Sequence, residues 1–178
     1  TAAYTVSLTS PAQTAVTVNL SYSGIAADGS DLTGVATVTI PAGSSSANFS
    51  VATLQDVLAE GAESFTVTIG SAAGGNFENL VISGTNAAAT TSITDDDTPA
   101  LSVSSPTVGE GGFAVFTVSL SNASTTAVTF NPTLVSGSAT VGTDTSTALE
   151  YFNGTSWVAV PVGGVTLAAG ATSVQIRV

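Results

Sequence analysis

Apolar and polar residues alternate along most of the chain. Five segments place an apolar residue at every second position: 4–10, 15–23, 35–40, 47–54 and 64–70. A period of two over such lengths predicts strands with one face in a core. Clusters of Gly, Pro, Ser, Asn and Asp separate the segments, and no segment has a helical period. The pattern therefore predicts an all-β fold of antiparallel sandwiches, with turns about every eight to twelve residues.

An internal repeat divides the chain into two copies. Residues 116–131 (FTVSLSNASTTAVTFN) match residues 4–19 (YTVSLTSPAQTAVTVN) without a gap, at an offset of 112 residues (116 − 4). Residues 168–178 match residues 41–51 at an offset of 127 (168 − 41), so the second copy is 15 residues longer (127 − 112). Much of that length is LEYFNGTSWVAV, where an Asn-Gly pair between two apolar runs predicts an added hairpin with a type I′ turn.

The repeat predicts two domains. We expect a first sandwich over residues 1–98 that lacks its N-terminal strand. Residues 99–178 are expected to form only the N-terminal part of a second sandwich, with the added hairpin near 148–160. Strands without partners leave open edges that invite pairing with another chain. We therefore expect the natural chain to continue in both directions as a tandem array.

Charge and composition exclude several classes of function. The chain has 12 acids and a single base, Arg177, for a net charge of −11, which argues against nucleic acid and anionic membranes as partners. Hydrophobic residues make up 43% and charged residues 7%, which is the opposite of a disordered acidic tail. Without His, Cys or Lys there is no nucleophile–base pair or thiolate metal site, and the acids gather in loops, so we expect no enzyme.

Asp95, Asp96 and Asp97 are adjacent in the sequence. Carboxylates about 4 Å apart repel by on the order of 4 kcal/mol per pair at an effective dielectric near 20. A solvated acidic linker tolerates this repulsion, and a bound cation reverses its sign. Ca²⁺ is the natural candidate because it takes six to eight oxygen ligands and prefers carboxylates, carbonyls and water.

Four motifs together resemble a known family. They are V-G-E-G-G before a strand (108–112), a G-T-D loop (142–144), D-x-x-x-E-x-x-E-S-F-T-V (56–67) and I-T-D-D-D-T-P (93–99). Their order and spacing resemble Calx-β domains, the immunoglobulin-like sandwiches of sodium/calcium exchangers and of very long bacterial surface adhesins. The Ser/Thr/Ala/Gly-rich composition without Lys resembles the adhesin arrays, often of the RTX type. The resemblance covers nearly the whole chain and implies tandem Calx-β-like sandwiches.

The resemblance also implies Ca²⁺ ligands at one apex of each sandwich, near the junction with the next domain. Carried over by position, the implied ligands are Asp31, Asp56, Glu60, Glu63, Asp95, Asp96 and Asp97 in the first copy, and Glu110 and Asp144 in the second. The family often has two Asp where this chain has Gln55-Asp56, which puts one ligand or one ion in doubt. The alternative interpretations are a charged loop for Glu60 and Glu63, and a turn or bulge for Glu110. The remaining acids, Asp28, Glu78 and Glu150, are expected to be surface charges.

The leading functional hypothesis is a structural one. The chain would be an extender segment of a bacterial cell-surface adhesin, outside the cell, with sandwiches stiffened by Ca²⁺ at their junctions. Its partners would be neighbouring repeats of the same chain, while other domains bind host or surface glycans or proteins. The alternative is a carbohydrate- or peptide-binding module built on the 148–160 hairpin, which should show a concave, aromatic-lined site. A calcium sensor like the exchanger domains is a third interpretation.

Overall fold

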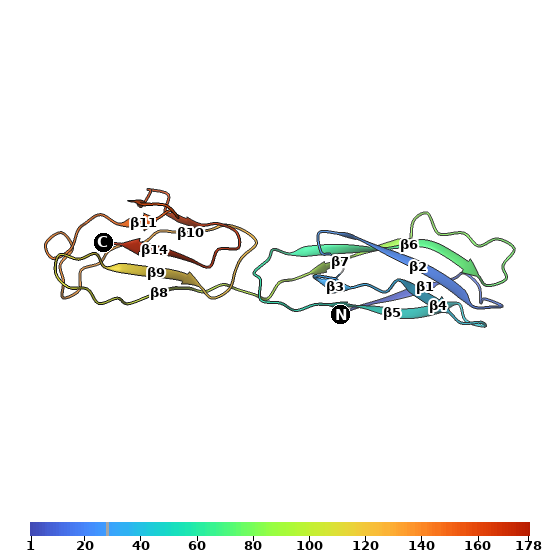
Figure 1. Cartoon of the computed structure of the whole chain (residues 1–178). Coiled ribbons are helices and arrows are strands. Elements are labelled where there is room, and N and C mark those ends of the chain that lie inside the picture. Colours follow the sequence, from blue (N-terminus) through green and yellow to red (C-terminus); the bar gives the residue numbers. More distant parts are fainter. Residues whose placement is uncertain (28) are drawn as a thin grey trace. The chain divides into compact units, whose positions relative to one another are not determined.

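The structure is a computed structural model that describes residues 1–27 and 29–178. Asp28, expected as a surface charge, lies outside the described residues. In the described part of the chain, the regular secondary structure consists of β-strands alone, and all named strand pairs are antiparallel (Figure 1). This confirms the predicted all-β class. Across these residues there is accordingly no helix of the length and apolar character that a membrane span requires.

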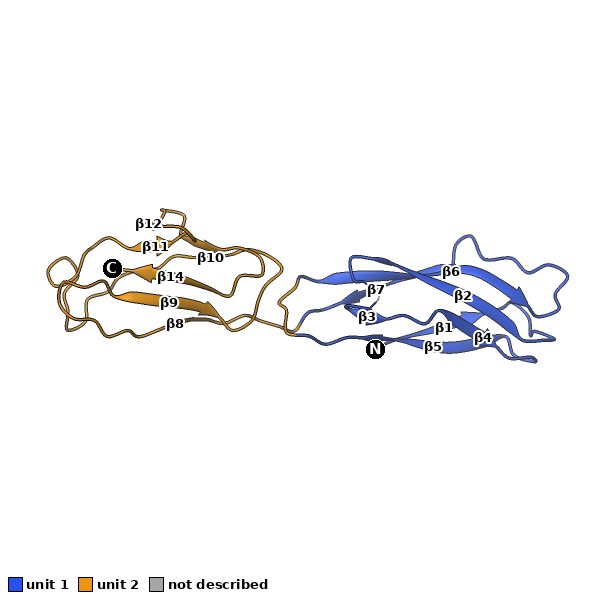
Figure 2. Ribbon diagram, viewed as in Figure 1, with its two compact units in different colours: residues 1–56, 61–95 blue, residues 57–60, 96–178 orange. Residues whose placement is uncertain are grey.

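The chain folds into two compact units (Figure 2). Unit 1 comprises Thr1–Asp56 and Gly61–Asp95, and unit 2 comprises Val57–Glu60 and Asp96–Val178. The short segment Val57–Glu60 belongs to unit 2 through Ala59, whose N–H donates to the Ala123 carbonyl at 2.9 Å.

Unit 1 consists of two antiparallel sheets. The smaller sheet has the order β1-β5-β3, with β1 at Ala2–Ser7, β5 at Ser46–Thr53 and β3 at Leu32–Thr33. The larger sheet has the order β4-β2-β6-β7, with β4 at Thr37–Ile40, β2 at Val16–Gly24, β6 at Glu63–Gly74 and β7 at Ala88–Ile93. These strands overlap all five alternating segments of the sequence.

The core of unit 1 lies between its two sheets. Alternation along β2 and β6 buries Val16, Val18 and Phe65, while Val51 from β5 and Leu32 from β3 are buried from the other sheet. Burying an apolar side chain of this size contributes about 1.5–3 kcal/mol. Side chains from both sheets share each cluster, so unit 1 is a sandwich.

Unit 2 has one larger and one smaller sheet. The larger sheet has the order β12-β11-β14-β9-β8, with β12 at Trp157–Ala159, β11 at Glu150–Phe152, β14 at Ser173–Arg177, β9 at Val115–Leu120 and β8 at Leu101–Val103. The smaller sheet pairs β10 at Val128–Phe130 with β13 at Val165–Leu167. Its core cluster contains Val118, Val165 and Ile176.

The hairpin of β11 and β12 has a longer turn than the sequence predicted. Phe152 pairs with Trp157, so four residues form the loop instead of two. Gly154 has a φ of 96°, while Asn153 is not among the described residues with positive φ, which rules out the predicted type I′ turn. The Asn153 Oδ1 atom instead accepts hydrogen bonds from the backbone N–H groups of Thr155 (3.0 Å) and Ser156 (2.9 Å). These Asx-type hydrogen bonds give two backbone N–H groups of the longer loop an acceptor.

The internal repeat extends to the strand register. In unit 1, Tyr4 lies opposite Phe49, and in unit 2 their counterparts at the two sequence offsets, Phe116 and Ile176, lie opposite each other. A second pairing corresponds in the same way: Val16 with Ile40, and Val128 with Leu167. The two units therefore repeat the same pairing of their first strands, between residues that the two sequence offsets identify as counterparts.

Candidate metal centre

Asp31 is held by a tight turn just before β3. Its Oδ2 atom accepts a hydrogen bond from the Ala27 N–H at 2.6 Å, and its own N–H donates to the Ala27 carbonyl at 3.0 Å. Gly29 provides the left-handed conformation that the turn needs, with a φ of 96°. Leu32 is fully buried directly after the turn. The turn and this anchor fix the position of the half-buried Asp31 carboxylate.

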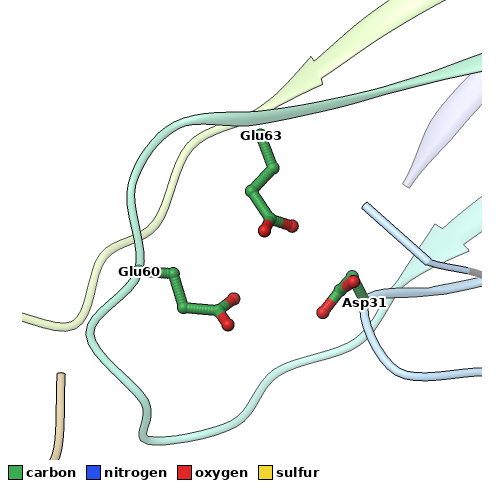
Figure 3. A group of neighbouring side chains, drawn as sticks. All are labelled: Asp31, Glu60 and Glu63. Carbon is green, nitrogen blue, oxygen red and sulfur yellow. The ribbon is translucent and has the colours of Figure 1, made fainter. Parts of the chain in front are cut away.

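Glu60 and Glu63 lie three residues apart where the chain enters β6. Glu63 is the first residue of β6 and lies opposite Ile93 of β7, and the buried Phe65 anchors the strand two residues later. Carboxylate oxygens of Asp31, Glu60 and Glu63 all lie within 4.8 Å of one another, and all three residues are half-buried. Figure 3 shows the three carboxylates directed toward a common space.

Neighbouring negative charges act on the Glu63 carboxyl of this group. Partial burial raises the pKa of the Glu63 carboxyl above its ordinary value, and the negative charges of Asp31, Asp56 and Asp95 raise it further. All four residues belong to unit 1. A carboxyl surrounded by like charges is a site where a bound cation stabilises the ionised form.

Asp95, Asp96 and Asp97 form a second acidic group just after β7. Their carboxylate oxygens also lie within 4.8 Å of one another; Asp95 and Asp97 are half-buried and Asp96 is exposed. The β6–β7 register explains why Asp95 acts on Glu63, because Glu63 lies opposite Ile93, two residues before Asp95. Six of the seven first-copy candidates thus lie in two acidic groups, and the seventh, Asp56, is exposed and acts on Glu63 through its charge.

The two second-copy candidates lie in neither group. Glu110 is exposed in a turn in which the Gly112 N–H donates to the Gly109 carbonyl at 3.1 Å, the geometry of the alternative interpretation. Asp144 repeats the turn of Asp31, because its Oδ2 atom accepts from the Thr140 N–H at 2.7 Å. Among the described residues, neither has two further acids close enough to complete a group of three.

Glu150, expected to be a surface charge, keeps 36% of its side chain exposed and forms an ion pair. Its Oε2 atom lies 2.6 Å from Nη2 of Arg177, the chain's single base. The Arg177 guanidinium also lies 4.0 Å from the ring centroid of Phe113 and 4.6 Å from that of Trp157. The cross-strand pairing of Glu150 with Arg177 could be predicted only once the register of β11 on β14 was known.

The residues present fit a hard divalent cation. Two oxygens bound to one Ca²⁺ at about 2.3–2.6 Å can be at most roughly 5 Å apart. The 4.8 Å limit within each acidic group satisfies this condition. Three carboxylates supply three to six oxygens, which leaves the remaining positions to carbonyls and water. Because the chain has no His or Cys, an all-oxygen donor set favours Ca²⁺ over softer metals.

The solved structures that match this chain include two of calcium-binding domains. The crystal structure of calcium-binding domain CBD12 of CALX1.1 is 18% identical, with a TM-score of 0.44, over 99% of this chain and 68% of that chain. The crystal structure of CBD12 from CALX1.2 is 17% identical, also with a TM-score of 0.44, over 99% of this chain and 69% of that one. Comparison with curated proteins gave no match.

Comparison with family models gave a match to the LapA domain over residues 1–96. That range contains six of the seven candidate ligands of the first copy, all but Asp97, and it covers more than half of the 178 residues. The chain belongs to the LapA domain family.

Proposed function

We propose that this chain is a structural extender segment of a bacterial cell-surface adhesin, with Ca²⁺ stiffening the junctions between its sandwiches. The observation that carries the proposal is the convergence of the carboxylates of Asp31, Glu60 and Glu63. Membership of the LapA domain family and the repeated strand register support a tandem array of such domains.

Calcium would act on the folded state and on the linker. Without the ion, the carboxylates at this end of unit 1 repel one another and favour protonation of Glu63. An extracellular site with a Kd of about 10⁻⁴–10⁻³ M is filled at millimolar Ca²⁺. At a hundredfold excess over Kd, one ion stabilises the folded state by about 2.7 kcal/mol. Asp95, Asp96 and Asp97 precede β8, so an ion bound there would restrict the chain that joins β7 to β8.

In this role the chain would lie outside the cell, at the bacterial surface, where Ca²⁺ is abundant. Its direct partners would be neighbouring repeats of the same chain, and other domains, in arrays often of the RTX type, would bind host or surface glycans or proteins. The chain itself would carry no catalytic activity, since the sequence offers neither a nucleophile–base pair nor a Lys base.

A ligand-binding module is the second candidate because unit 2 has a cavity of about 470 Å³. Leu149, Ala159 and Val160, from the segment of the added hairpin, line it together with Pro132 and Leu134. None of the described residues that line the cavity is aromatic, and the Trp157 ring packs against Arg177. The stacked aromatic platform that a sugar site uses is therefore missing from this cavity, which favours the extender role.

The test is a calcium titration of the thermal unfolding transition. We expect millimolar Ca²⁺ to raise the melting temperature of the native chain by several degrees, since about 1 kcal/mol moves a domain of this size by roughly 4–8 °C. The double variant Glu60→Gln/Glu63→Gln should lose that rise. Glu78→Gln, which removes an exposed acid outside both acidic groups, is the matched control and should keep it.

A second variant separates the linker from the sandwich. The double variant Asp96→Asn/Asp97→Asn should keep most of the calcium-dependent rise in melting temperature. If Ca²⁺ narrows the distribution of intramolecular distances that small-angle X-ray scattering measures for the native chain, the same variant should abolish that narrowing. If the native chain shows neither a melting shift nor a narrowing, calcium is not the ligand of these groups. The Leu149–Val160 cavity then becomes the place to look for function.

A further inference from the structure

The sequence contains four N-x-[ST] motifs, the acceptor pattern for the attachment of a sugar to an asparagine side chain. They begin at Asn19, Asn48, Asn122 and Asn153. Such short matches arise by chance in a chain rich in Ser and Thr, so their structural context has to distinguish them. An acceptor has to lie in a surface loop, where the bulky sugar and the enzyme that transfers it can reach the amide nitrogen.

Three of the motifs lack this context. Asn19 lies in β2, between β4 and β6, and its Nδ2 atom donates to the Ser71 Oγ atom at 2.8 Å. Asn48 lies in β5 opposite Thr5 of β1, and its Oδ1 atom accepts from the Thr5 hydroxyl at 2.8 Å. The third motif ends at Ser124, whose residue surface is only 7% exposed. In each case a strand ladder or burial withholds part of the motif from a modifying enzyme.

The fourth motif forms the loop of the β11–β12 hairpin. Asn153, Gly154, Thr155 and Ser156 are all exposed. A side chain added at Gly154 would begin in open space, since beyond its chain neighbours no atom lies within 4 Å of the added Cβ position. The loop belongs to the extra length of the second copy, outside the repeated pattern of the two units. It therefore meets the requirement for a surface loop that the other three motifs do not meet.

Hydrogen bonds within this loop orient the Asn153 carboxamide. Its Oδ1 atom accepts from the Thr155 hydroxyl at 2.9 Å, in addition to the backbone N–H groups of Thr155 and Ser156. The third residue of the motif thus binds the amide oxygen of the first. In the part of the chain that the structure describes, the Asn153 Nδ2 atom makes no hydrogen bond. The oxygen is held by three donors, while the nitrogen that would accept a sugar is left available.

We propose that Asn153 is an N-glycosylation site, and that the donor is a sugar activated as a glycosyl diphosphate. The Asn153 Nδ2 atom attacks the anomeric carbon of the sugar, and the bond from that carbon to the diphosphate oxygen breaks as the new C–N bond forms. The diphosphate leaves with the electron pair, and one Nδ2 proton passes to a base of the transferase. The three donors stabilise the negative charge that gathers on Oδ1 as the nitrogen loses its proton.

The modification would place a bulky, polar group on the tip of the added hairpin. It uses neither acidic group and no Ca²⁺, so it succeeds or fails separately from the proposed calcium sites. It draws on the proposed function only for the location of the chain outside the cell.

The first test uses the native protein, isolated from the cells that make it. Peptide mass mapping locates any attached sugar. We expect a sugar on Asn153, and no sugar on Asn19, Asn48 or Asn122. A native protein in which Asn153 is unmodified overturns the proposal, whatever the calcium titration of the melting temperature shows.

The second test measures transfer to the intact, unmodified chain. One reaction supplies a nucleoside-diphosphate sugar and another a polyprenyl-pyrophosphate oligosaccharide, each with an N-glycosyltransferase that uses that donor, which distinguishes the two sources of a glycosyl diphosphate. Transfer should occur at Asn153. At the other three motifs it should be slower by about tenfold or more, because those sites need local opening of the fold. Equal rates at Asn153 and at another motif of the folded chain would overturn the proposal.

Two variants test the hydrogen bond within the motif. Thr155→Val keeps the backbone N–H donors and the branched shape but removes the hydroxyl, and it should slow transfer by about tenfold. Thr155→Ser keeps the hydroxyl and should keep most of the rate. The fluorescence of Trp157 checks that the hairpin folds in both variants. A Val variant that reacts as fast as the native chain would contradict the role of the hydroxyl.

A control without the fold separates the loop from its sequence. Short synthetic peptides carrying each of the four motifs should all accept the sugar, because no strand or core restricts them. If only the Asn153 peptide does so, the residue types select the site and the argument from the hairpin fails.

Discussion

Units 1 and 2 repeat one strand register but bury their side chains very differently. Among the described residues, six of the seven largest fully buried side chains are in unit 1 and one, Val165, is in unit 2. Within the described residues, the sheet opposite the first strand has four strands in unit 1 and two in unit 2, so less of the facing apolar surface is covered in unit 2. An alternating segment thus determines which face of a strand is apolar, while the opposing sheet determines how far that face is buried.

The sharpest way to test this comparison is to remove a core side chain from unit 1. Phe65 is fully buried and its ring lies 6.5 Å from that of Tyr4 and 6.4 Å from that of Tyr22. Phe65→Ala should destabilise unit 1 by about 3–5 kcal/mol, because it leaves a cavity as well as losing apolar burial. Calorimetry should show the loss in one transition.

The single Trp residue separates the two units in this experiment. Trp157 belongs to unit 2, so its fluorescence should report a transition that Phe65→Ala leaves in place. Val81→Ala, at a 72% exposed position in unit 1, is the control and should change the stability by less than about 0.5 kcal/mol. A Trp157 transition that moves together with the calorimetric one would mean that the units unfold as one body.

The next largest effect compares the same turn in the two units. Asp31 and Asp144 accept the same hydrogen bond from the residue four positions earlier, but among the residues that the structure describes only Asp31 lies near two other acids. Asn retains an acceptor oxygen for that hydrogen bond, so Asp31→Asn and Asp144→Asn should both preserve their turns. At a hundredfold excess of Ca²⁺, Asp31→Asn should lose about 2.7 kcal/mol of calcium-dependent stabilisation.

Asp144→Asn should keep the full calcium response, measured as the shift of the melting temperature with and without millimolar Ca²⁺. Equal losses in the two variants would show that the turn itself binds the ion. Equal responses would show that Asp31 contributes nothing to the site.

The sequence predicted the strands better than the turn that joins β11 to β12. Period-two alternation was sufficient for the all-β class, and the two offsets identified which residues of the two copies correspond, but the pairing of Tyr4 with Phe49 and of Phe116 with Ile176 came from the structure. The turn of the added hairpin was predicted wrongly as two residues, because the Asn153 side chain caps a four-residue loop, a competition that residue types alone do not resolve. Turn length depends on side-chain hydrogen bonds as well as on backbone preference.

The acids of both groups were named from the sequence through the family resemblance, but the distances between them could not be predicted from it. Neighbouring acids such as Asp95, Asp96 and Asp97 are visible in any sequence, and Glu60 and Glu63 are three residues apart. Asp31 is distant in sequence, and only the fold of the β3 turn brings its carboxylate to them. The ion pair of Glu150 with Arg177 depends on register across β11 and β14, which the sequence does not encode locally.

A smaller effect is expected from the cation of unit 2. Arg177 joins Glu150, Phe113 and Trp157, and no equivalent cation exists in unit 1, since Arg177 is the chain's only base. Arg177→Gln should lower the stability of unit 2 by about 1 kcal/mol, combining a partly exposed ion pair with a cation–π contact. Chemical unfolding followed at Trp157 measures this loss, and Arg177→Lys should restore only part of it because Lys lacks the planar guanidinium. A Lys variant as stable as the native chain would show that charge alone matters there.

The smallest effect is a pH dependence specific to unit 1. The pKa of Glu63 in the folded state is raised by its burial and by neighbouring carboxylates. A carboxyl with a raised folded-state pKa binds its proton more tightly when folded, so its stabilising contribution is complete below the unfolded-state pKa and is lost as the pH rises through the folded-state pKa. In chelator, the melting temperature of unit 1 should therefore fall as the pH rises across that window, and Glu63→Gln should flatten this fall. Saturating Ca²⁺ should flatten it too, because the ion favours the ionised carboxylate that high pH produces. The contrary result would be a melting temperature that rises with pH in chelator, and a rise that Glu63→Gln removes. It would mean that the fold stabilises the Glu63 carboxylate without the ion, and the electrostatic argument for a cation at this end of unit 1 would be lost.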